Sequence, residues 1–438
     1  MIALRTFITA AALLGAAAVA SAQETIVIRG GTVHPVSGPS FVGNVVIQGG
    51  RIAAVGADVE APAGARVIDA AGLHVYPGLF DAGSQLGLTE IDAVAVTNDI
   101  DELGDFTPHL QARTAVNPAS EHIPVARSNG ITHTLALPGG SSGFFRSPSA
   151  GFPGQGSVFN LAGWTIEEME VTPSAVMVME WPSMRTGGGR FAFAFGFGPT
   201  RERSYREIKE EHDRAVHNLR EWLAQARGYD RAVSGGARIP RDLRLEALAR
   251  AAKGELPVLV RVDQARDIRE VVAFAEQEGL KLIIGGAGEG YKVADLLAEK
   301  GIPVILGPTQ ALPRSPDASY AEAYANPGIL HAAGVKIAFA TFNSSDSRTL
   351  PYEAAMATGY GLPRDVALRA ITLNPAEILG LGDCLGSIEV GKIANIIVTD
   401  GDPLEIRTQI KHLIIGGQEV STDNKHQQLY EKYRARPK

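Results

Sequence analysis

The spacing of apolar residues changes along the chain and divides it into two β-rich ends and a mixed middle. Residues 45–55 (VVIQGGRIAAV) and residues 412–420 (HLIIGGQEV) each carry a short apolar run that leads to a Gly-Gly pair. Such a pattern is typical of a hairpin with a two-residue turn. Residues 394–399 add another β-rich run near the C-terminus. We therefore expect one small β domain assembled from both ends, with a polar, frayed tail after Ser421.

The middle of the chain alternates helical spacing with short, continuous apolar runs. Such runs begin at Val258, Leu280 and Ile302, at a constant spacing, and the helices between them end at Gly279 and Gly301. Glycine is the usual residue just past a helix C-terminus. Continuous apolar strands with helical crossovers indicate a parallel sheet buried on both faces. The pattern fits a (β/α)8 barrel or a doubly wound sheet. No G-x-G-x-x-G motif opens a helix after the first strand, which disfavours a dinucleotide-binding version.

The first residues have the features of an export signal. Arg5 is followed by an alanine-rich apolar run over residues 7–20, and Ala20-Ser21-Ala22 fits a small-x-small cleavage site. The run is short for a membrane span. We expect a mature chain that starts near Gln23, without a membrane anchor, in the periplasm or secreted.

Composition excludes several classes of protein. The 438 residues are 45% hydrophobic and 20% charged, too apolar for a disordered chain. A net charge of -7 and only 6% aromatic residues disfavour nucleic-acid binding. Cys384 is the single cysteine, which excludes an internal disulfide and a cysteine-based metal cluster.

The usual catalytic patterns are missing. No H-x-H occurs; we expect His212 and His217, on a charged helix, to be solvated, and His133, within a strand, to be a core residue. No G-x-S-x-G nucleophile elbow occurs either. The serine-rich segment 139–143 is a flexible turn or an anion-binding nest of backbone amides. The aromatic-glycine segment Gly187–Gly198 is either a flap over a pocket or a hairpin that forms an oligomer contact.

Two motifs resemble the amidohydrolase superfamily, of the imidazolonepropionase-like and dihydroorotase-like kind. Residues 75–81 (VYPGLFD) are similar to the family's V-x-P-G-L-I-D at the first barrel strand. Residues 374–381 (NPAEILGL) and 386–403 (GSIEVGKIANIIVTDGDP) resemble its N-P-A-x-x-L-G-L and G-S-I-E-x-G-K-x-A-D-x-V-x-x-D-x-D-P segments. The resemblance spans nearly the whole mature chain.

The resemblance implies an α/β fold, a (β/α)8 TIM-like barrel with a small β-sandwich domain built from both termini. The division that we expect is a signal peptide (1–22), a β-sandwich (23–75 and 385–425), a barrel (76–384) and a polar tail (426–438).

Where the family carries its metal ligands, this chain departs from the pattern. The family's D-x-H-x-H stands here as Asp81-Ala82-Gly83-Ser84-Gln85, so both histidines are replaced. The strand-five histidine aligns with Asp263, the strand-six histidine with Gly286 and the strand-eight aspartate with Phe342. The family's zinc-bound hydroxide therefore lacks its usual ligands, and we expect no metal and no cofactor unless a non-standard site exists.

Two hypotheses follow. In the first, the chain is a degenerate homologue that binds a small molecule or peptide, as a homo-oligomer or in a hetero-oligomer with an active paralogue. In the second, it is an active hydrolase of non-peptide carbon–nitrogen bonds, in cyclic amides or N-acyl compounds, through a carboxylate-based site. The candidate catalytic residues are Asp81, Asp263 and Asp346, with Glu90 near in sequence. The candidate pocket residues are Gln85, Gly286, Phe342 and Asn343.

Overall fold

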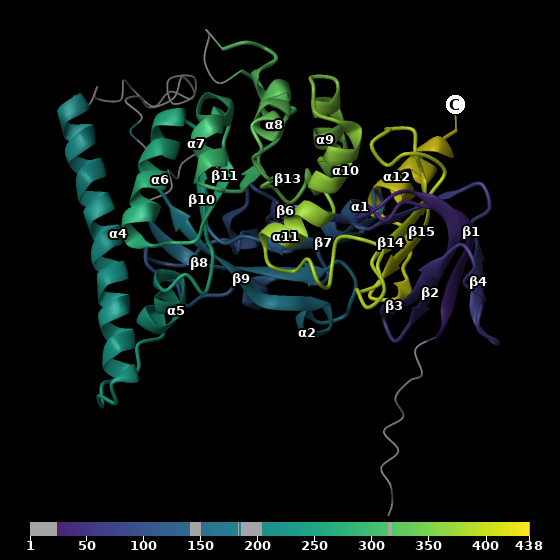
Figure 1. The fold of residues 1–438 in the computed structure, drawn as a ribbon, viewed down its shortest axis with the longest axis horizontal. Helices are drawn as coiled ribbons and strands as arrows, with labels where there is room; N and C mark the ends of the chain where they lie inside the picture. Colours follow the sequence, from purple (N-terminus) through teal and green to yellow (C-terminus); the bar gives the residue numbers. More distant parts are fainter. Residues whose placement is uncertain (1–23, 141–149, 183, 185–203, 314–317, 438) are drawn as a thin grey trace, which may run out of the picture.

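The computed structural model of the chain contains two eight-stranded sheets flanked by helices (Figure 1). It describes residues 24–140, 150–182, 184, 204–313 and 318–437. The expected signal peptide, the segment Gly187–Gly198 and residues 141–149 of the serine-rich loop lie outside these ranges. Within the described ranges, no helix is both long enough and apolar enough to cross a membrane.

The first sheet takes strands from both ends of the chain, drawn in purple and yellow in Figure 1. Its strands are β1 (Ile26–Val33), β2 (Phe41–Gln48), β3 (Arg51–Gly56), β4 (Arg66–Asp69), β5 (His74–Pro77), β14 (Ile396–Thr399), β15 (Ile410–Ile415) and β16 (Gln418–Glu419). Their order is β16-β15-β14-β5-β1-β2-β3, with β4 pairing β1. The antiparallel pairing of β14 with β5 is the ladder that joins the two ends of the chain.

Both expected hairpins are present. In the β2–β3 turn, Gly49 and Gly50 have φ of 55° and 77°, and in the β15–β16 turn Gly416 and Gly417 have φ of 58° and 79°. Two successive residues with positive φ are what a type I′ hairpin turn requires, and glycine adopts them without strain.

The second sheet is a nearly closed barrel. Its strands are β6 (Leu79–Ser84), β7 (Ile131–Ala136), β8 (Gly151–Asn160), β9 (Glu170–Glu180), β10 (Val258–Val262), β11 (Leu282–Gly286), β12 (Val304–Leu306) and β13 (Ile337–Phe339). They follow one another in sequence order around the sheet. Just past β13, the Phe342 N–H donates to the Gly83 carbonyl on β6 at 2.8 Å, which brings the two edge strands together.

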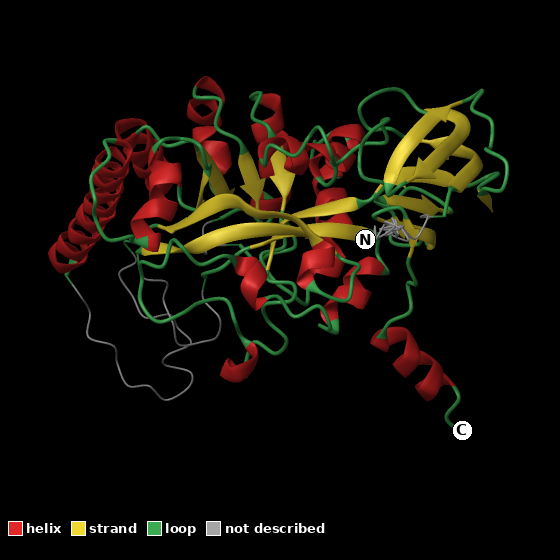
Figure 2. Ribbon diagram, turned by 90° about the horizontal axis from the view of Figure 1, so that it is seen from below, coloured by secondary structure: helices red, strands yellow, loops and turns green. Residues whose placement is uncertain are grey.

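The barrel differs from an all-parallel one at β8. That strand runs antiparallel to both β7 and β9, whereas the other neighbouring strands are parallel. The long strands β8 and β9 therefore form a hairpin in the wall, visible as the two long arrows in Figure 2. β11 and β12 begin two residues later than the apolar runs suggested, because Leu280 and Ile302 still belong to the turns that follow the helices.

Helices cover the outside of the barrel (Figures 1 and 2). The α-helices are α1 (His122–Arg127), α2 (Ile166–Met169), α4 (Tyr205–Ser234), α5 (Leu243–Ala252), α6 (Ala265–Glu278), α7 (Ala294–Glu299), α8 (Glu322–Ala332), α9 (Leu350–Thr358), α10 (Arg364–Ala370), α11 (Leu373–Ile378) and α12 (Lys425–Arg434). Four 3-10 turns are η1 (Ala95–Thr97), η2 (Ala112–Ala115), η3 (Gly290–Val293) and η4 (Ser347–Thr349). As expected, α6 ends at Gly279, which adopts the left-handed conformation at φ 61°.

The C-terminal tail was wrongly expected to fray, since most of it forms α12. The Asn424 side chain accepts hydrogen bonds from the backbone N–H groups of His426 and Gln427 and so caps the helix N-terminus. Figure 2 shows α12 standing away from the two sheets.

The barrel interior is a packed apolar core with alternating in-and-out positions. Every strand contributes to one interior cluster, for example Val176 and Val178 from β9, Leu259 from β10 and Ile283 from β11. The residues between them, such as Val258 and Val260, pack outward in a separate cluster against the helices. This period of two fixes which residues reach the mouth of the barrel, at the carboxyl ends of the parallel strands.

Candidate functional site

The uppermost inward layer of the barrel is formed by four glycines and three side chains. Following the alternation one step above the interior cluster gives Gly139, Glu180, Arg261, Gly285, Gly307 and Phe342. On β6 the register shifts between Asp81 and Ser84, and Gly83 belongs to this layer because a Cβ there would lie 3.0 Å from the Phe342 ring. The members of this layer are close neighbours: a Cβ added at Gly83, Gly139, Gly285 or Gly307 would lie within 4 Å of another residue of the layer. We call these seven residues the mouth layer. They lie where (β/α)8 enzymes place their catalytic groups.

Phe342 occupies the centre of the mouth layer. A Cβ on Gly83 would lie 3.0 Å from the Phe342 ring, one on Gly285 3.5 Å and one on Gly307 3.9 Å. The residue has φ of 50°, a left-handed conformation that is costly for a side chain with a Cβ. Its ring packs against the interior cluster below. A Cβ on Gly83 would also lie 2.9 Å from Leu137 Cδ1, so a histidine there would require Leu137 and Phe342 to shift.

Arg261 and Glu180 lie beside the ring and form an incompletely paired charge couple. The Arg261 guanidinium stacks 5.5 Å from the centre of the Phe342 ring. One of its nitrogens (Nη2) is 3.8 Å from Glu180 Oε1, too far for a hydrogen bond. The same Glu180 oxygen is buried and accepts no hydrogen bond from the described part of the chain. Gly140 allows the guanidinium to approach, since a Cβ there would lie 2.5 Å from Nη2.

Asp81 is completely buried and held by four hydrogen bonds. Its Oδ2 accepts from the hydroxyls of Thr341 at 2.6 Å and Ser347 at 2.7 Å. Its Oδ1 accepts from the backbone N–H groups of Thr341 at 3.1 Å and Gly83 at 3.3 Å. Burial raises the pKa of Asp81 to about 6, and the four hydrogen bonds oppose that rise. The carboxylate thus joins the β6 and β13 ends and is enclosed by protein on both oxygens.

Asp263 lies just past β10 and supports the neighbouring turn. Its Oδ1 accepts from the Gly288 N–H at 3.2 Å, and its backbone carbonyl accepts from the Glu289 N–H at 2.8 Å. Gly286 has φ of 84°, and a Cβ there would lie 2.7 Å from the same Asp263 oxygen. A histidine at Gly286 would be strained in backbone and side chain alike. The inward-facing neighbour is Gly285, one position earlier.

The remaining predicted residues are spread over the surrounding loops. Asn343 Oδ1 accepts from Ser345 N–H at 2.7 Å and from Asp346 N–H at 3.1 Å, so its side chain builds the loop before η4. Asp346 is exposed at the start of η4. Gln85 is buried, and its side-chain amide donates a long 3.4 Å bond to the Gly139 carbonyl. Asp81, Asp263 and Asp346 therefore have separate surroundings, and no hydrogen bond links them among the described residues.

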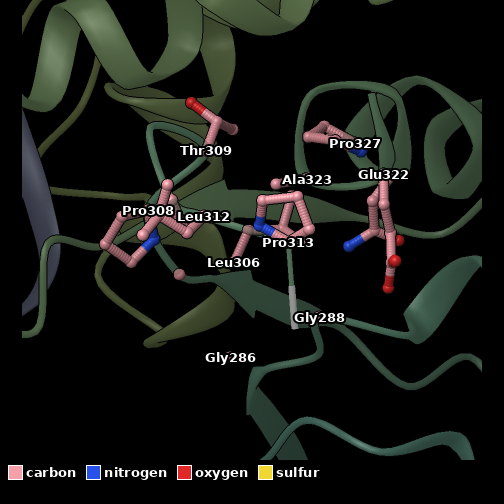
Figure 3. A pocket seen from close by; sticks show the side chains of 13 residues that line it. Gly286, Gly288, Leu306, Pro308, Thr309, Leu312, Pro313, Glu322, Ala323 and Pro327 are labelled. Carbon is pink, nitrogen blue, oxygen red and sulfur yellow. The ribbon is translucent and has the colours of Figure 1, made fainter. Parts of the chain in front are cut away.

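A cavity of about 230 Å³ opens next to the mouth layer, between the β11 and β12 ends and α8 (Figure 3). It adjoins the mouth layer at Gly307 and also touches Gly286. Its walls are mostly apolar, and Glu322 from α8 is its one charged lining residue among those that the structure describes. The cavity therefore lies at the carboxyl ends of β11 and β12.

The mouth layer does not fit a zinc ion. Among the described residues, no group of three or more His, Cys, Asp or Glu side chains is placed to hold a metal. All ten histidines of the sequence lie within the described ranges. Gly83, Gly286 and Phe342, at three of the implied ligand positions, carry no atom that binds zinc.

The histidines were predicted with mixed success. His133 is a core residue as expected: it is fully buried and its Nδ1 lies 2.6 Å from the Thr132 hydroxyl. His217 is exposed as expected. The prediction for His212 was wrong, because α4 turns that side chain inward, where it is buried against Trp181 and lies 3.2 Å from Glu270.

Sequence reasoning missed Arg261 and Glu180. Arg261 lies within the apolar strand Val258–Val262 (VLVRV). Glu180 is the last residue of β9, after the apolar residues of its MVME end. A charged residue at an inward position of such a strand is the signal that could have found them, since burying it costs energy without a partner. For β9 the alternation could not be assigned before the strand itself was known.

Comparisons with known proteins decide the family. The amidohydrolase family profile matches residues 209–420. A solved amidohydrolase from Thermotoga maritima shares 28% sequence identity, covers 90% of this chain and 99% of its own, and superposes with a TM-score of 0.76. These matches make the chain similar to the amidohydrolase superfamily over most of its length. The expected relationship and fold are thereby confirmed.

Other amidohydrolase relatives match shorter parts or with lower identity. Amidohydrolase tasK of Hapsidospora irregularis is 25% identical over 84% of this chain, which spans 38% of that protein. Imidazolonepropionase of Sphingopyxis alaskensis is 42% identical over 17% of this chain and 19% of its own length. The chain thus spans well under half the length of these two relatives. A solved molinate hydrolase, at 18% identity and a TM-score of 0.53, shares the fold.

Proposed function

We propose that this amidohydrolase-superfamily chain is a degenerate homologue. It keeps the barrel and a ligand site at the mouth, and it does not perform metal-assisted hydrolysis of carbon–nitrogen bonds. The observation that carries the proposal is the Phe342 ring, which lies against Gly83, Gly285 and Gly307 at the centre of the mouth layer. Metal-assisted hydrolysis needs several ligand side chains converging on one point.

The substitutions are mutually consistent, which supports this proposal over loss of one ligand alone. Phe342 excludes a side chain at Gly83, and Asp263 excludes one at Gly286. Restoring any single histidine would therefore not rebuild the centre. The mouth layer is packed around the residues that are present.

The alternative of a carboxylate-based hydrolase rests on one observation, the raised pKa of Asp81, near 6. A general acid works best with a pKa close to the working pH. However, Asp81 is fully buried and both of its oxygens already accept hydrogen bonds. A substrate would have to displace Thr341 or Ser347 to reach it, so we favour the first proposal.

A hydrolysis assay distinguishes the two. The purified chain is tested against cyclic amides, dipeptides and N-acyl amino acids, with and without added zinc, beside the Thermotoga maritima amidohydrolase as positive control. The proposal expects no turnover above the uncatalysed rate in either condition. Turnover abolished by a chelator would overturn it. Turnover that survives chelation and is lost in Asp81→Asn, Asp263→Asn or Asp346→Asn would establish the carboxylate alternative.

Export and partnering belong to the same proposal. Residues 1–22 support secretion or a periplasmic location by their sequence, and N-terminal sequencing of protein from the exported fraction tests cleavage before Gln23. Protein retained in the cytoplasm with residues 1–22 intact would contradict it. A pull-down from the exporting cell tests association with an active paralogue, and size-exclusion chromatography with light scattering tests a homo-oligomer.

A further inference from the structure

The charge couple in the mouth layer has bonding capacity that the described protein groups do not use. Arg261 carries five N–H donors, and its nearest carboxylate oxygen, on Glu180, is 3.8 Å away. The Glu180 oxygen is a buried acceptor without a hydrogen bond among the described residues. Their side chains are only 24% and 9% exposed, so water compensates them incompletely. A buried polar group without a partner is costly and is often completed by a ligand.

The surroundings favour a ligand over a purely structural pair. An ion pair of similar burial is closed: Arg227 donates to Glu278 at 2.8 Å, with side chains 28% and 13% exposed. The Arg261–Glu180 couple is open by comparison, at 3.8 Å, and each of its side chains lies against a glycine: Glu180 against Gly139 and Arg261 against Gly140. Four of the seven mouth-layer positions are glycines, and solvent reaches the remaining exposed surface of Arg261.

We propose that the mouth layer binds a small free α-amino acid, with the ligand's carboxylate on Arg261 and its ammonium group on Glu180. The ligand is neutral overall, as is the couple, and it places an anionic and a cationic group side by side. Each charge of the protein then gains a charge-assisted hydrogen bond. The Phe342 ring provides an apolar surface beside the two groups. This inference deepens the proposed function by naming the ligand class of the same site.

A neutral cis-amide, such as a lactam, also offers an acceptor and a donor side by side. It would leave both protein charges with dipoles as their only partners, in a site that water reaches poorly. The zwitterion is therefore the ligand that the geometry favours, and the lactam is an outcome of the test.

The test measures binding to the full-length mature chain by isothermal titration calorimetry. The probes are the free L-α-amino acids and, for each one that binds, its N-acetyl derivative, its decarboxylated amine and a lactam of similar size. We expect at least one amino acid to bind, and each analogue that lacks one charge to bind about tenfold to 100-fold more weakly. Arg261→Gln should weaken amino-acid binding by a similar factor and leave the affinity for the amine unchanged. Glu180→Gln should weaken amino-acid binding by a similar factor and leave the affinity for the N-acetyl derivative unchanged.

Arg227→Gln and Glu278→Gln are the matched controls, since they open an ion pair of similar burial elsewhere, and they should leave binding unchanged. If Arg261→Gln fails to fold, Arg261→Lys keeps the charge but loses the paired donors, and the same loss of amino-acid affinity is expected. Two results overturn the inference: no amino acid bound at millimolar concentration, or a lactam bound as tightly as the best amino acid. Neither result touches the proposed absence of metal-assisted hydrolysis, which the turnover assay tests separately.

Discussion

The backbone N–H of Phe342 donates a 2.8 Å hydrogen bond to the carbonyl of Gly83, and the Phe342 ring lies over the same glycine. The first and last barrel strands are thus joined at the point where the resemblance places two metal ligands. Phe342 therefore both links the two edge strands of the barrel and fills the barrel mouth. Its left-handed backbone is strained, and the packing of the ring compensates for that strain.

Phe342→Ala should lower stability, because it removes the ring and keeps the strained backbone. For a partly exposed phenylalanine we expect a loss of about 1–3 kcal/mol. Phe342→Gly removes the same ring but relieves the positive φ. The glycine variant should therefore be more stable than the alanine variant by about 1 kcal/mol, measured by urea unfolding. A glycine variant less stable than the alanine variant would show that the backbone at residue 342 is not strained.

Gly286→Ala tests whether a side chain at the strand-six position is excluded. The new Cβ would lie 2.7 Å from Asp263 Oδ1, at a φ of 84°. Gly301→Ala is the matched control, because Gly301 also has positive φ but has nothing within 4 Å of the added Cβ. Both should lose stability from backbone strain, and Gly286→Ala should lose about 1–3 kcal/mol more from the contact with Asp263. Equal losses in chemical unfolding would mean that Asp263 does not exclude a side chain there.

Asp81 should make stability fall as pH rises through the weakly acidic range. Its pKa is about 6 in the folded protein against an ordinary value of 3.8, so the folded state binds the proton more tightly. That advantage is fully present below pH 3.8 and is lost as pH rises through about 6. Asp81→Asn keeps the shape but does not titrate. Between pH 4 and pH 7, the free energy of unfolding of Asp81→Asn should therefore rise by on the order of 2 kcal/mol relative to that of wild type.

A constant difference between Asp81→Asn and wild type over the same range would contradict the raised pKa.

His133 should act in the opposite direction. Complete burial lowers its pKa to about 3 from an ordinary value of 6.5, so the unfolded chain binds the proton more tightly. Stability from this residue is present above pH 6.5 and falls as pH drops toward 3. The slope is about 1.4 kcal/mol per pH unit at most. His133→Gln should flatten the acid side of the stability curve. Parallel curves for His133→Gln and wild type would refute this assignment.

In wild type, the titrations of Asp81 and His133 overlap in pH and change the free energy of unfolding in opposite directions. A flat wild-type curve between pH 4 and pH 6 is therefore expected, and only the single variants separate the two contributions.

Much of the fold followed from the sequence because its signals are local. Gly49-Gly50 and Gly416-Gly417 predicted their hairpins, since two positive φ angles in succession leave few other residues possible. Gly279 predicted the end of α6 in the same way. The antiparallel strand β8 was not predicted. β8 pairs with β7 and β9, the strands before and after it in the sequence, but its glycine-rich start hides the period of two.

The candidate site was predicted only where the family resemblance reached. The substitutions at Gly83, Gly286 and Phe342 were visible in the sequence, but their mutual exclusion depends on distances between different strands. For the same reason the isolation of Asp81 from Asp263 could not be foreseen. Arg261 and Glu180 stand on the neighbouring strands β10 and β9, and only the pairing of these two strands brings them together.

The central claim is that the barrel mouth holds no catalytic metal, and zinc content per chain tests it most directly. The protein is expressed with excess zinc, freed of loosely bound ions by dialysis and analysed by inductively coupled plasma mass spectrometry, beside Asp263→Ala. The account predicts zinc far below one ion per chain, with no difference between the two proteins. One tightly bound zinc ion per chain, lost in Asp263→Ala, would contradict it.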